Sequence, residues 1–399
     1  MKFAGDFHIH SKYSRAVSPA MNLANIDRWA KVKGIKVVGT GDFTHPLWFE
    51  EIKGELEPAE SGLFKFKGYD FGTRFLLTSE ISCIYKKKGK VRKTHIIIFA
   101  PSIEVVEKIN AKLGEIGNLH SDGRPILGLD SKELLKIVLS ADENCLFVPA
   151  HAWTPWFSVF GSKSGFDSLE ECFDEDVKNI YAIETGLSSD PAMNWRVSNL
   201  DKVSLISNSD AHSLAKIGRE ANVFDTELNY ESIIETIKTK NKKKFLYTIE
   251  FFPEEGKYHY DGHALCNFSC SPKESKKYNN ICPKCKKPLI IGVLNRVEEL
   301  ADRPEGFVPK NAIPYKSLIP LNEIIAESLG VSLASKEVVK HYNNLINGLG
   351  SELEILLDVN EKEIEKKSLL KIAAAIMKVR KGEVVIDPGY DGIFGKIKI

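Results

Sequence analysis

Histidine and carboxylate side chains stand at the ends of six short apolar runs in the first 225 residues. The runs are residues 7–10, 36–42, 75–80, 146–151, 181–184 and 204–212. Each run has the β-branched or aromatic composition of a strand and closes with His, Asp or Glu. These groups are too many for one proton-transfer pair and too many to bury without partners. The pattern therefore predicts a cluster of divalent metal ions.

The spacing within two of these runs supports a metal cluster. His8 and His10 are two residues apart, so on a strand both imidazoles face the same side and reach one ion. Asp210 and His212 repeat this spacing on another strand. Glu80 can bridge two ions, because a carboxylate offers two oxygens. Glu184 is left open between a ligand and a structural carboxylate at the same place.

Four of the seven cysteines are clustered in a second motif. They are Cys266, Cys270, Cys282 and Cys285. Their spacing lets four thiolates surround one Zn²⁺, and a reducing cytosol and the lysine-rich loop 271–281 favour zinc over the alternative of two disulfides. His259 and His263, just upstream, would replace a cysteine that is not a ligand. A module this small predicts a structural zinc that supports folding and a surface facing nucleic acid.

Charge and hydropathy restrict the class of protein. With 55 Lys and Arg against 54 Asp and Glu, the net charge is +1, so a polyanionic partner must be held by local patches. Basic runs at 85–93, 238–244 and 276–287 are each commonly solvated surface, but three in one near-neutral chain favour phosphate contact. The chain has no apolar signal segment at its N-terminus and no run near the roughly 18 apolar residues of a membrane span. We therefore expect a cytoplasmic protein with no membrane partner.

The elements that must position the metal ligands alternate along the first 225 residues. Predicted helices at 25–32, 131–140 and 168–176 separate the strand-like runs, which is the pattern of an α/β barrel or wound sheet. In a parallel barrel the carboxyl ends of the strands meet at one rim, so side chains far apart in sequence converge there. A hairpin of residues 81–85 and 91–99 would fold His95 back toward Glu80.

The rest of the chain divides into three further parts. We expect a metal-dependent barrel at 1–225, a connecting helix and strand at 226–258, the four-cysteine module at 259–292 and a mostly helical C-terminal region at 293–399. Within the last part, helices are predicted at 321–329, 335–348, 353–357 and 361–381, with a closing hairpin after residue 384.

The barrel motifs resemble the PHP (polymerase and histidinol phosphatase) superfamily over residues 1 to about 225. They are His8-x-His10, Thr40-Gly41-Asp42, Glu80, His95, His151 and Asp210-x-His212. The resemblance implies a distorted (βα)7 barrel that holds up to three metals, with ligands His8, His10, Glu80, His95, His151, Asp210 and His212. Many members have Asp-His where this chain has Asp42-Phe43, so either Asp42 or the displaced His45 would serve as a further ligand. The usual histidine after the first motif is absent, and Ser14 and Arg15 stand near its place.

The zinc module, the loop 303–307 and the helical tail extend the resemblance, so that the whole chain is similar to the endonuclease Q family. That resemblance implies a metal-dependent DNA repair endonuclease, which hydrolyses the phosphodiester 5′ to uracil, hypoxanthine and xanthine and to abasic sites. It also implies two to three divalent metals (Zn²⁺, Mn²⁺ or Mg²⁺) in the barrel, one structural Zn²⁺ and a DNA-binding role for 293–399. Protein partners from replication or repair are left open.

Two alternatives remain. One is a small-molecule phosphoesterase of the histidinol phosphatase type, against which the zinc module and the basic runs argue. The other is a non-catalytic nucleic-acid-binding accessory protein, against which the nearly complete ligand set argues.

Individual roles follow from this function. Asp210 is the predicted ligand that also takes a proton from the nucleophile, and Arg196 or Arg15 is the predicted cation on the phosphate. The aromatic residues after His151 would stack on a flipped nucleotide, with core packing as the alternative. These are Trp153, Trp156 and Phe157. Asn194 is predicted to read the base.

Overall fold

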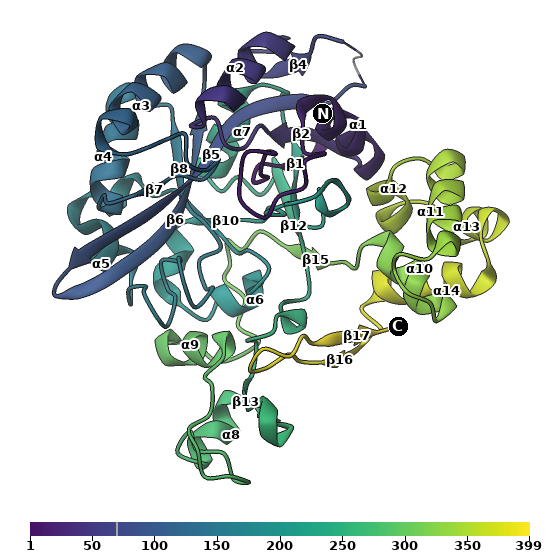
Figure 1. The fold of residues 1–399 in the computed structure, drawn as a ribbon. Helices are drawn as coiled ribbons and strands as arrows, with labels where there is room; N and C mark the ends of the chain where they lie inside the picture. Colours follow the sequence, from purple (N-terminus) through teal and green to yellow (C-terminus); the bar gives the residue numbers. More distant parts are fainter. Residues whose placement is uncertain (69–70) are drawn as a thin grey trace.

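The larger part of the molecule is a closed ring of seven strands, and the computed structural model describes residues 1–68 and 71–399 (Figure 1). The ring strands are β1 (Lys2–Asp6), β2 (Ile35–Gly39), β5 (Arg74–Lys87), β6 (Lys90–Ala100), β8 (Leu146–Pro149), β9 (Ala182–Glu184) and β10 (Ser204–Ile206). Pairing is parallel from β1 through β2 to β5, and again between β9 and β10, whereas β6 runs antiparallel between β5 and β8. A bridge between Ile9 and Ala211 joins the ring beyond the ends of β1 and β10. Between β8 and β9 the described residues form no strand pairing, and the contact there is the Ala152 N–H donating to the Glu184 carbonyl oxygen. This confirms the predicted distorted seven-stranded α/β barrel.

Helices cover the outside of the barrel, because their apolar faces pack on the strands. They are α1 (Leu23–Lys33), α2 (Pro46–Glu55), α3 (Ile103–Ile116), α4 (Ser131–Ala141), α5 (Leu169–Phe173), α6 (Pro191–Asn194) and α7 (Tyr230–Lys238). The helices predicted at 25–32 and 131–140 correspond to α1 and α4. The segment predicted as a helix at 168–176 is α5 followed by a 3-10 turn at Asp174–Asn179.

The hairpin of β5 and β6 projects from the barrel and changes the position of Glu80 (Figure 1). The pairing confirms the hairpin predicted at 81–85 and 91–99, but the strand predicted to end at Glu80 runs on without a break into the hairpin and ends at Lys87. Glu80 therefore lies inside a strand, where the cross-strand pairing fixes its backbone.

The sheet continues beyond the ring on both sides. Strands β11 (Ala221–Asp225), β12 (Phe245–Glu250) and β15 (Tyr315–Ser317) extend it from β1, while β4 (Phe64–Phe66) and β3 (Leu56–Pro58) extend it from β5. A short strand, β7 (Ile126–Leu127), also pairs with β5. The first extension carries the chain out of the barrel toward the C-terminal half.

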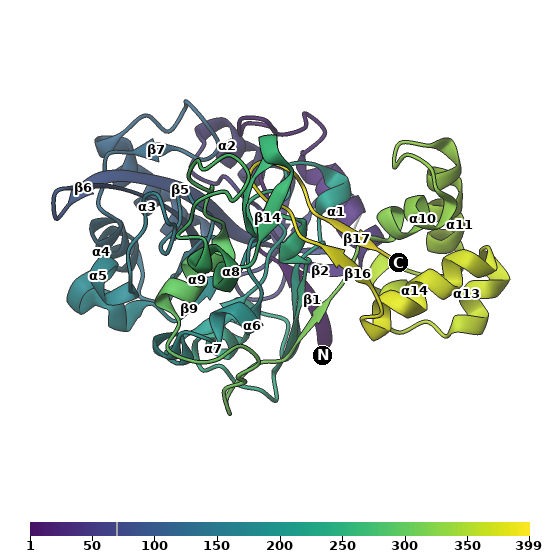
Figure 2. The same ribbon diagram turned by 90° about the horizontal axis from the view of Figure 1, so that it is seen from below.

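The C-terminal half forms two separate bodies beside the barrel (Figures 1 and 2). The cysteine module contains β13 (Asp261–His263), β14 (Phe268–Cys270) and α8 (Pro272–Lys277), and α9 (Val293–Leu300) leads out of it. The helical body contains α10 (Leu321–Leu329), α11 (Lys336–Leu349), α12 (Glu352–Leu357), α13 (Glu361–Lys367) and α14 (Leu370–Lys381). The hairpin of β16 (Val385–Asp387) and β17 (Lys396–Lys398) follows it, as predicted. The single helix predicted at 361–381 is two helices, because Ser368 is extended and ends α13.

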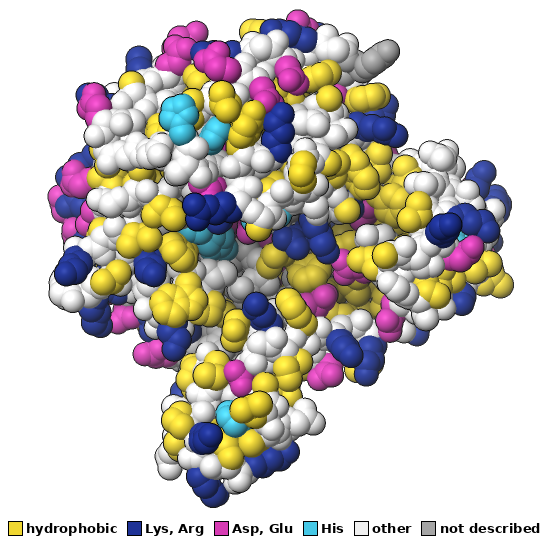
Figure 3. Space-filling view, in the orientation of Figure 1, with side chains coloured by type: hydrophobic (Ala, Val, Ile, Leu, Met, Phe, Trp, Pro, Cys, Tyr) yellow, Lys and Arg dark blue, Asp and Glu magenta, His cyan; other side chains and the backbone are white. Residues whose placement is uncertain are grey.

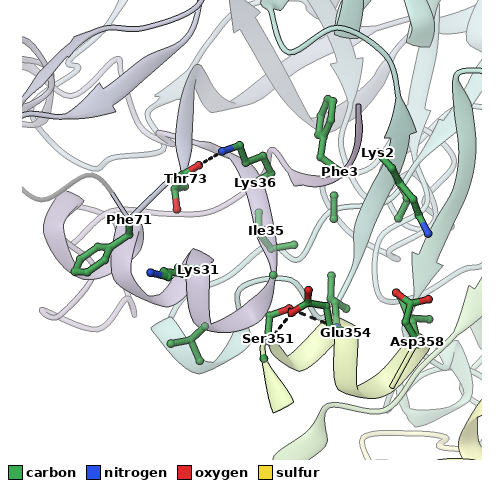
Figure 4. Close-up of a pocket in the computed structure, with 18 of the residues that line it drawn as sticks. Lys2, Phe3, Lys31, Ile35, Lys36, Phe71, Thr73, Ser351, Glu354 and Asp358 are labelled. Carbon is green, nitrogen blue, oxygen red and sulfur yellow. Dashed lines mark hydrogen bonds between the residues drawn. The ribbon is translucent and has the colours of Figure 1, made fainter. Parts of the chain in front are cut away.

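The helical body docks on α1 through a buried ion pair. Lys33 Nζ lies 2.6 Å from a Glu352 oxygen that also accepts the Tyr342 hydroxyl at 2.6 Å. Next to this contact, a cavity of about 760 Å³ separates the starts of β1 and β2 from α12 (Figure 4). No helix among the described residues is long and apolar enough to cross a membrane.

Glu250, buried in β12, makes stability depend on pH. Burial raises its pKa to about 8 even though Thr248 and Thr185 donate hydrogen bonds to its carboxylate. The folded state therefore binds more protons than the unfolded state from about pH 4.5 to 8, and the unfolding free energy falls as the pH rises through this window. We expect Glu250→Gln to raise the unfolding free energy on the order of 2 kcal/mol more at pH 8.5 than at pH 5.

Denaturant unfolding at the two pH values checks this expectation. Glu231 is exposed on α7, so Glu231→Gln serves as the control and should change stability by less than about 0.5 kcal/mol at either pH. An equal effect of Glu250→Gln at pH 5 and pH 8.5 would contradict the proposed cause.

Candidate metal centre

The metal donors of the barrel form two groups that share Glu80. The first contains His8, His10, Glu80 and Asp210, and the second contains Glu80, His95 and His151. Glu80 Oε2 lies 3.5 Å from His8 Nε2 and 3.3 Å from His10 Nε2. Its other oxygen, Oε1, lies 2.7 Å from His95 Nδ1 and 3.1 Å from His151 Nε2. Glu80 would therefore contribute one oxygen to each of two ions, if both groups bind metal.

Three donor atoms of the first group make no hydrogen bond, which fits a bound cation. His8 Nε2, His10 Nε2 and Asp210 Oδ1 are buried and make no hydrogen bond within the described chain. Burial by itself would lower the pKa of both histidines, but neighbouring carboxylates outweigh it and raise each pKa. The site therefore attracts positive charge, and imidazole with carboxylate is a donor set that Zn²⁺ or Mn²⁺ accepts.

Two further carboxylates orient the histidines of the first group. Asp42 Oδ1 lies 3.0 Å from His10 Nδ1, and Glu184 Oε1 lies 3.0 Å from His8 Nδ1. These contacts assign the ring protons to Nδ1 and leave each Nε2 lone pair for a metal. Asp42, a predicted ligand, therefore lies behind the ligands, since its other oxygen accepts from Ser11 and Ser14. Glu184 is likewise a supporting carboxylate.

Sharp turns after the strands aim these side chains at the rim. Asp42, His151 and Asp210 all have positive φ angles, of 48°, 28° and 47°. Such backbone is costly for residues other than glycine and gathers at functional sites. The adjoining Gly41 has φ +61°, and a Cβ there would lie 2.2 Å from the Ile9 carbonyl oxygen. This turn therefore needs glycine to bring Asp42 against His10.

The remaining predicted barrel ligands lie outside the two groups. His212 Nδ1 is 2.9 Å from the Asp210 carbonyl oxygen, and its ring packs 4.7 Å from that of His10. His45 stacks on Tyr13 with a centroid distance of 4.5 Å. The described part of the barrel thus brings together six of the eight predicted metal ligands, without Asp42 and His212.

Three residues that were predicted to contact the substrate contact other residues of the protein instead. Arg196 pairs with Glu298 of α9 and is mostly buried, so its charge is already compensated. Trp153 is 1% exposed, and its indole N–H donates to Asn194 Oδ1 at 2.8 Å. The Asn194 amide nitrogen donates to Ser189 and to a backbone carbonyl. The side-chain polar atoms of Trp153 and Asn194 are therefore satisfied in the interior.

Trp156 and Phe157 remain beside the metal donors. The Phe157 ring lies 4.7 Å from the His95 ring, while Trp156 is 54% exposed. Lys93 Nζ lies 5.5 Å from the Trp156 ring and 5.3 Å from the Phe157 ring. This combination of an exposed aromatic face and a cation suits a nucleotide.

Sequence reasoning missed Arg124. Its Nη1 lies 3.0 Å from Glu80 Oε2. The residue stands just before β7, and nothing in the run around it marks a strand that ends in a functional residue. Only the pairing of β7 with β5 brings it to Glu80, so no local signal could have found it.

Figure 3 shows the surface of the molecule on the face seen in Figure 1. Histidine side chains (cyan) lie at the floor of a hollow on this face, with Lys and Arg side chains (dark blue) around it. The hollow opens between the barrel, the cysteine module and the helical body.

The cysteine module holds a separate group of donors. It contains His263, Cys266, Cys282 and Cys285, with His263 Nδ1 3.6 Å from Cys285 Sγ. Burial raises the pKa of Cys282, but the backbone amides of Cys285 and Lys284 outweigh it and lower the pKa. Cys270 lies outside the group because it pairs in register with Asp261, at the far end of the β13–β14 hairpin from His263. His263, the upstream alternative, would take its place as the fourth donor if the module binds zinc.

We expect Cys270→Ser to keep one zinc ion in this module and Cys282→Ser to lose it. Cys282 is a proposed ligand, so its loss removes the metal whose binding supports folding of the module. Cys270, in contrast, contributes only packing. Metal analysis of the purified variants, with limited proteolysis of residues 259–292, distinguishes them. Loss of zinc from a folded Cys270→Ser protein would contradict this expectation and favour the predicted site of four cysteines.

Comparisons with known proteins cover the whole chain. The family model of the MJ0043 C-terminal domain matches residues 320–383. Protein YqxK of Bacillus subtilis is 30% identical over 417 residues, which is 100% of this chain and 99% of YqxK. Protein MJ0043 of Methanocaldococcus jannaschii is 35% identical over 255 residues, which is 62% of this chain but only 31% of MJ0043.

Two solved structures share the complete fold. The lesion-specific endonuclease PfuEndoQ of Pyrococcus furiosus is 33% identical with a TM-score of 0.89, covering 100% of this chain and 96% of that one. Endonuclease Q in complex with a 27-mer duplex substrate, with an abasic lesion at the active site, is 33% identical with a TM-score of 0.86, covering 100% and 97%.

Proposed function

The chain belongs to the endonuclease Q family of PHP-type endodeoxyribonucleases, and from this we propose that it cuts DNA 5′ to deaminated bases and abasic sites. The deaminated bases are uracil, hypoxanthine and xanthine. Hydrolysis at this position adds water across the phosphodiester, so the upstream 3′ oxygen leaves as a hydroxyl and the lesion strand keeps a 5′ phosphate.

One observation carries the proposal: two donor groups share a single buried carboxylate, in a chain that matches endonuclease Q over its full length. His8, His10 and Asp210 with Glu80 would hold one ion, and His95 and His151 with Glu80 the other. Two such ions would supply the positive charge that activates a water and neutralises the phosphodiester.

The protein groups provide position and proton transfer. The Asp210 side chain lies beside the other donors and is 26% exposed, so solvent reaches it, and it is the proposed acceptor of the proton of the attacking water. We propose that residues 1–225 perform the cleavage in this way. The cysteine module and residues 293–399 would hold the duplex on either side of the barrel. We propose that the protein acts in the cytoplasm, with replication or repair proteins as further partners.

Trp156 is the proposed stacking surface for the displaced nucleotide. Its exposed ring and the nearby Lys93 lie beside the segment that follows His151. We expect Trp156→Ala to weaken binding of lesion DNA about 10- to 100-fold, since stacking contributes on the order of 1–3 kcal/mol per base. Trp153 is buried and therefore offers no matched control. Tyr181→Ala, which removes a partly exposed ring elsewhere, serves as the control and is expected to bind lesion DNA as tightly as wild type.

The proposal is tested with end-labelled duplexes that carry one uracil, hypoxanthine, xanthine or abasic site. Purified protein and Asp210→Asn are incubated with each duplex and with undamaged DNA, in Mg²⁺ or Mn²⁺. A single nick 5′ to the lesion, absent in the variant, supports the proposal. Uncut lesion DNA together with hydrolysis of histidinol phosphate would favour a small-molecule phosphoesterase.

A further inference from the structure

We propose that Arg124 is the catalytic residue that contacts the scissile phosphate, in the place the sequence assigned to Arg196. This inference rests on the proposed function and deepens it. Its first ground is position, because the Arg124 guanidinium is 3.0 Å from Glu80, the carboxylate common to both donor groups.

The Arg124 side chain is only partly used by the protein. A guanidinium has five N–H donors, and one of them contacts Glu80 Oε2. The side chain is 26% exposed, and none of its nitrogens is buried without a partner. Its remaining donors therefore have access to solvent. Arg196, in contrast, is held by Glu298 and the Arg303 carbonyl oxygen.

The segment that carries Arg124 is fixed to the metal centre. The Arg124 backbone N–H donates to Asp122 Oδ1 at 3.1 Å. A Cβ at Gly123 would lie 2.3 Å from Asp42 Oδ2 and 2.3 Å from Ser14 Oγ, so this turn packs directly against the support of His10. On the other side, the Pro125 carbonyl oxygen accepts from Ser82 in β5, the strand of Glu80.

These contacts hold the charge in position before substrate binds. A planar guanidinium binds two oxygens of one phosphate through parallel hydrogen bonds. As water attacks phosphorus and the 3′ oxygen leaves, negative charge grows on the non-bridging oxygens, and a preorganised cation stabilises that charge. Glu80 holds Arg124 beside the metal donors, so a phosphate bound to those donors would lie within reach of the guanidinium.

The test compares Arg124→Ala, Arg124→Lys and Arg28→Ala, the last an exposed arginine on α1. Single-turnover cleavage of the abasic-site duplex is expected to fall about 100- to 1000-fold in Arg124→Ala. Arg124→Lys should recover part of the rate, added guanidinium should rescue the alanine variant, and Arg28→Ala should match wild type. Metal content is expected to stay at the wild-type level in all three.

A second measurement does not depend on cleavage. Titration of the metal-loaded proteins with inorganic phosphate should show at least about tenfold weaker binding to Arg124→Ala. Loss of metal in proportion to activity, or unchanged phosphate affinity, would overturn the proposal and make Arg124 a support for Glu80. If wild type cuts no lesion DNA, the proposed function fails, while phosphate affinity still decides the role of Arg124.

Discussion

Glu80→Gln is expected to lower the cleavage rate on the order of 10³-fold or more and to reduce the metal content of the barrel. An amide has no negative charge and only one oxygen, so it cannot bridge both donor groups. Glu80 Oε2 serves His8 and His10, while Oε1 serves His95 and His151, so one substitution damages both groups. A loss of several kcal/mol of electrostatic stabilisation corresponds to this rate change.

Metal analysis of graded variants tests the bridging role. His95→Ala damages only the second group, so we expect it to lose about one ion while Glu80→Gln loses more. Glu115→Gln, at an exposed position of α3, should keep both metal content and rate. A Glu80→Gln protein with a full metal content and wild-type cleavage would refute the bridge.

The barrel could be predicted because its signal is local and repeated. Each of the six predicted runs ends at a His, Asp or Glu of the centre or its support. The strand bounds were less accurate, since β1 ends at Asp6 and β10 at Ile206, and His8, His10, Asp210 and His212 lie beyond them. The hairpin predicted at 81–85 and 91–99 is confirmed, but it was expected to follow a strand ending at Glu80, whereas both parts form the single strand β5, since no turn residue separates them. The predicted single helix 361–381 failed because the break at Ser368 has neither Gly nor Pro to mark it.

The site itself was predicted by residue type more accurately than by role. Histidine spacing identified His8 and His10. For Asp42, the sequence cannot distinguish a carboxylate that binds a metal from one that accepts a hydrogen bond from a histidine. Its role depends on a hydrogen bond to His10 across 32 residues. Arg196 and Arg124 also look alike, and only their partners, Glu298 and Glu80, separate a structural cation from one at the metal centre. Roles that depend on long-range contacts cannot be read from spacing.

Asp42→Asn is expected to weaken metal binding to the first group about 10- to 100-fold, with a parallel loss of cleavage at limiting metal. Asp42 Oδ2 accepts from the Ser11 backbone N–H at 2.7 Å and from Ser14 Oγ at 2.8 Å. If the oxygen of the introduced amide takes this position, the NH₂ group of the amide faces His10 Nδ1 and must donate to it. The His10 proton then moves to Nε2, where it blocks the lone pair that a metal needs. If the amide is reversed, NH₂ meets the fixed Ser11 N–H, and two donors oppose each other.

Metal dependence separates this defect from that of Glu80→Gln. High concentrations of Mn²⁺ should restore much of the cleavage by Asp42→Asn, because all the ligands are still present, but little of that by Glu80→Gln. Ser14→Ala removes one donor to Asp42 and leaves the His10 contact intact, so it should retain nearly normal metal affinity. Competition with a chelating indicator measures the affinities. Normal metal affinity in an Asp42→Asn protein that remains inactive would mean that Asp42 acts on the substrate, because a carboxylate that only fixes the His10 tautomer has no other route to the reaction.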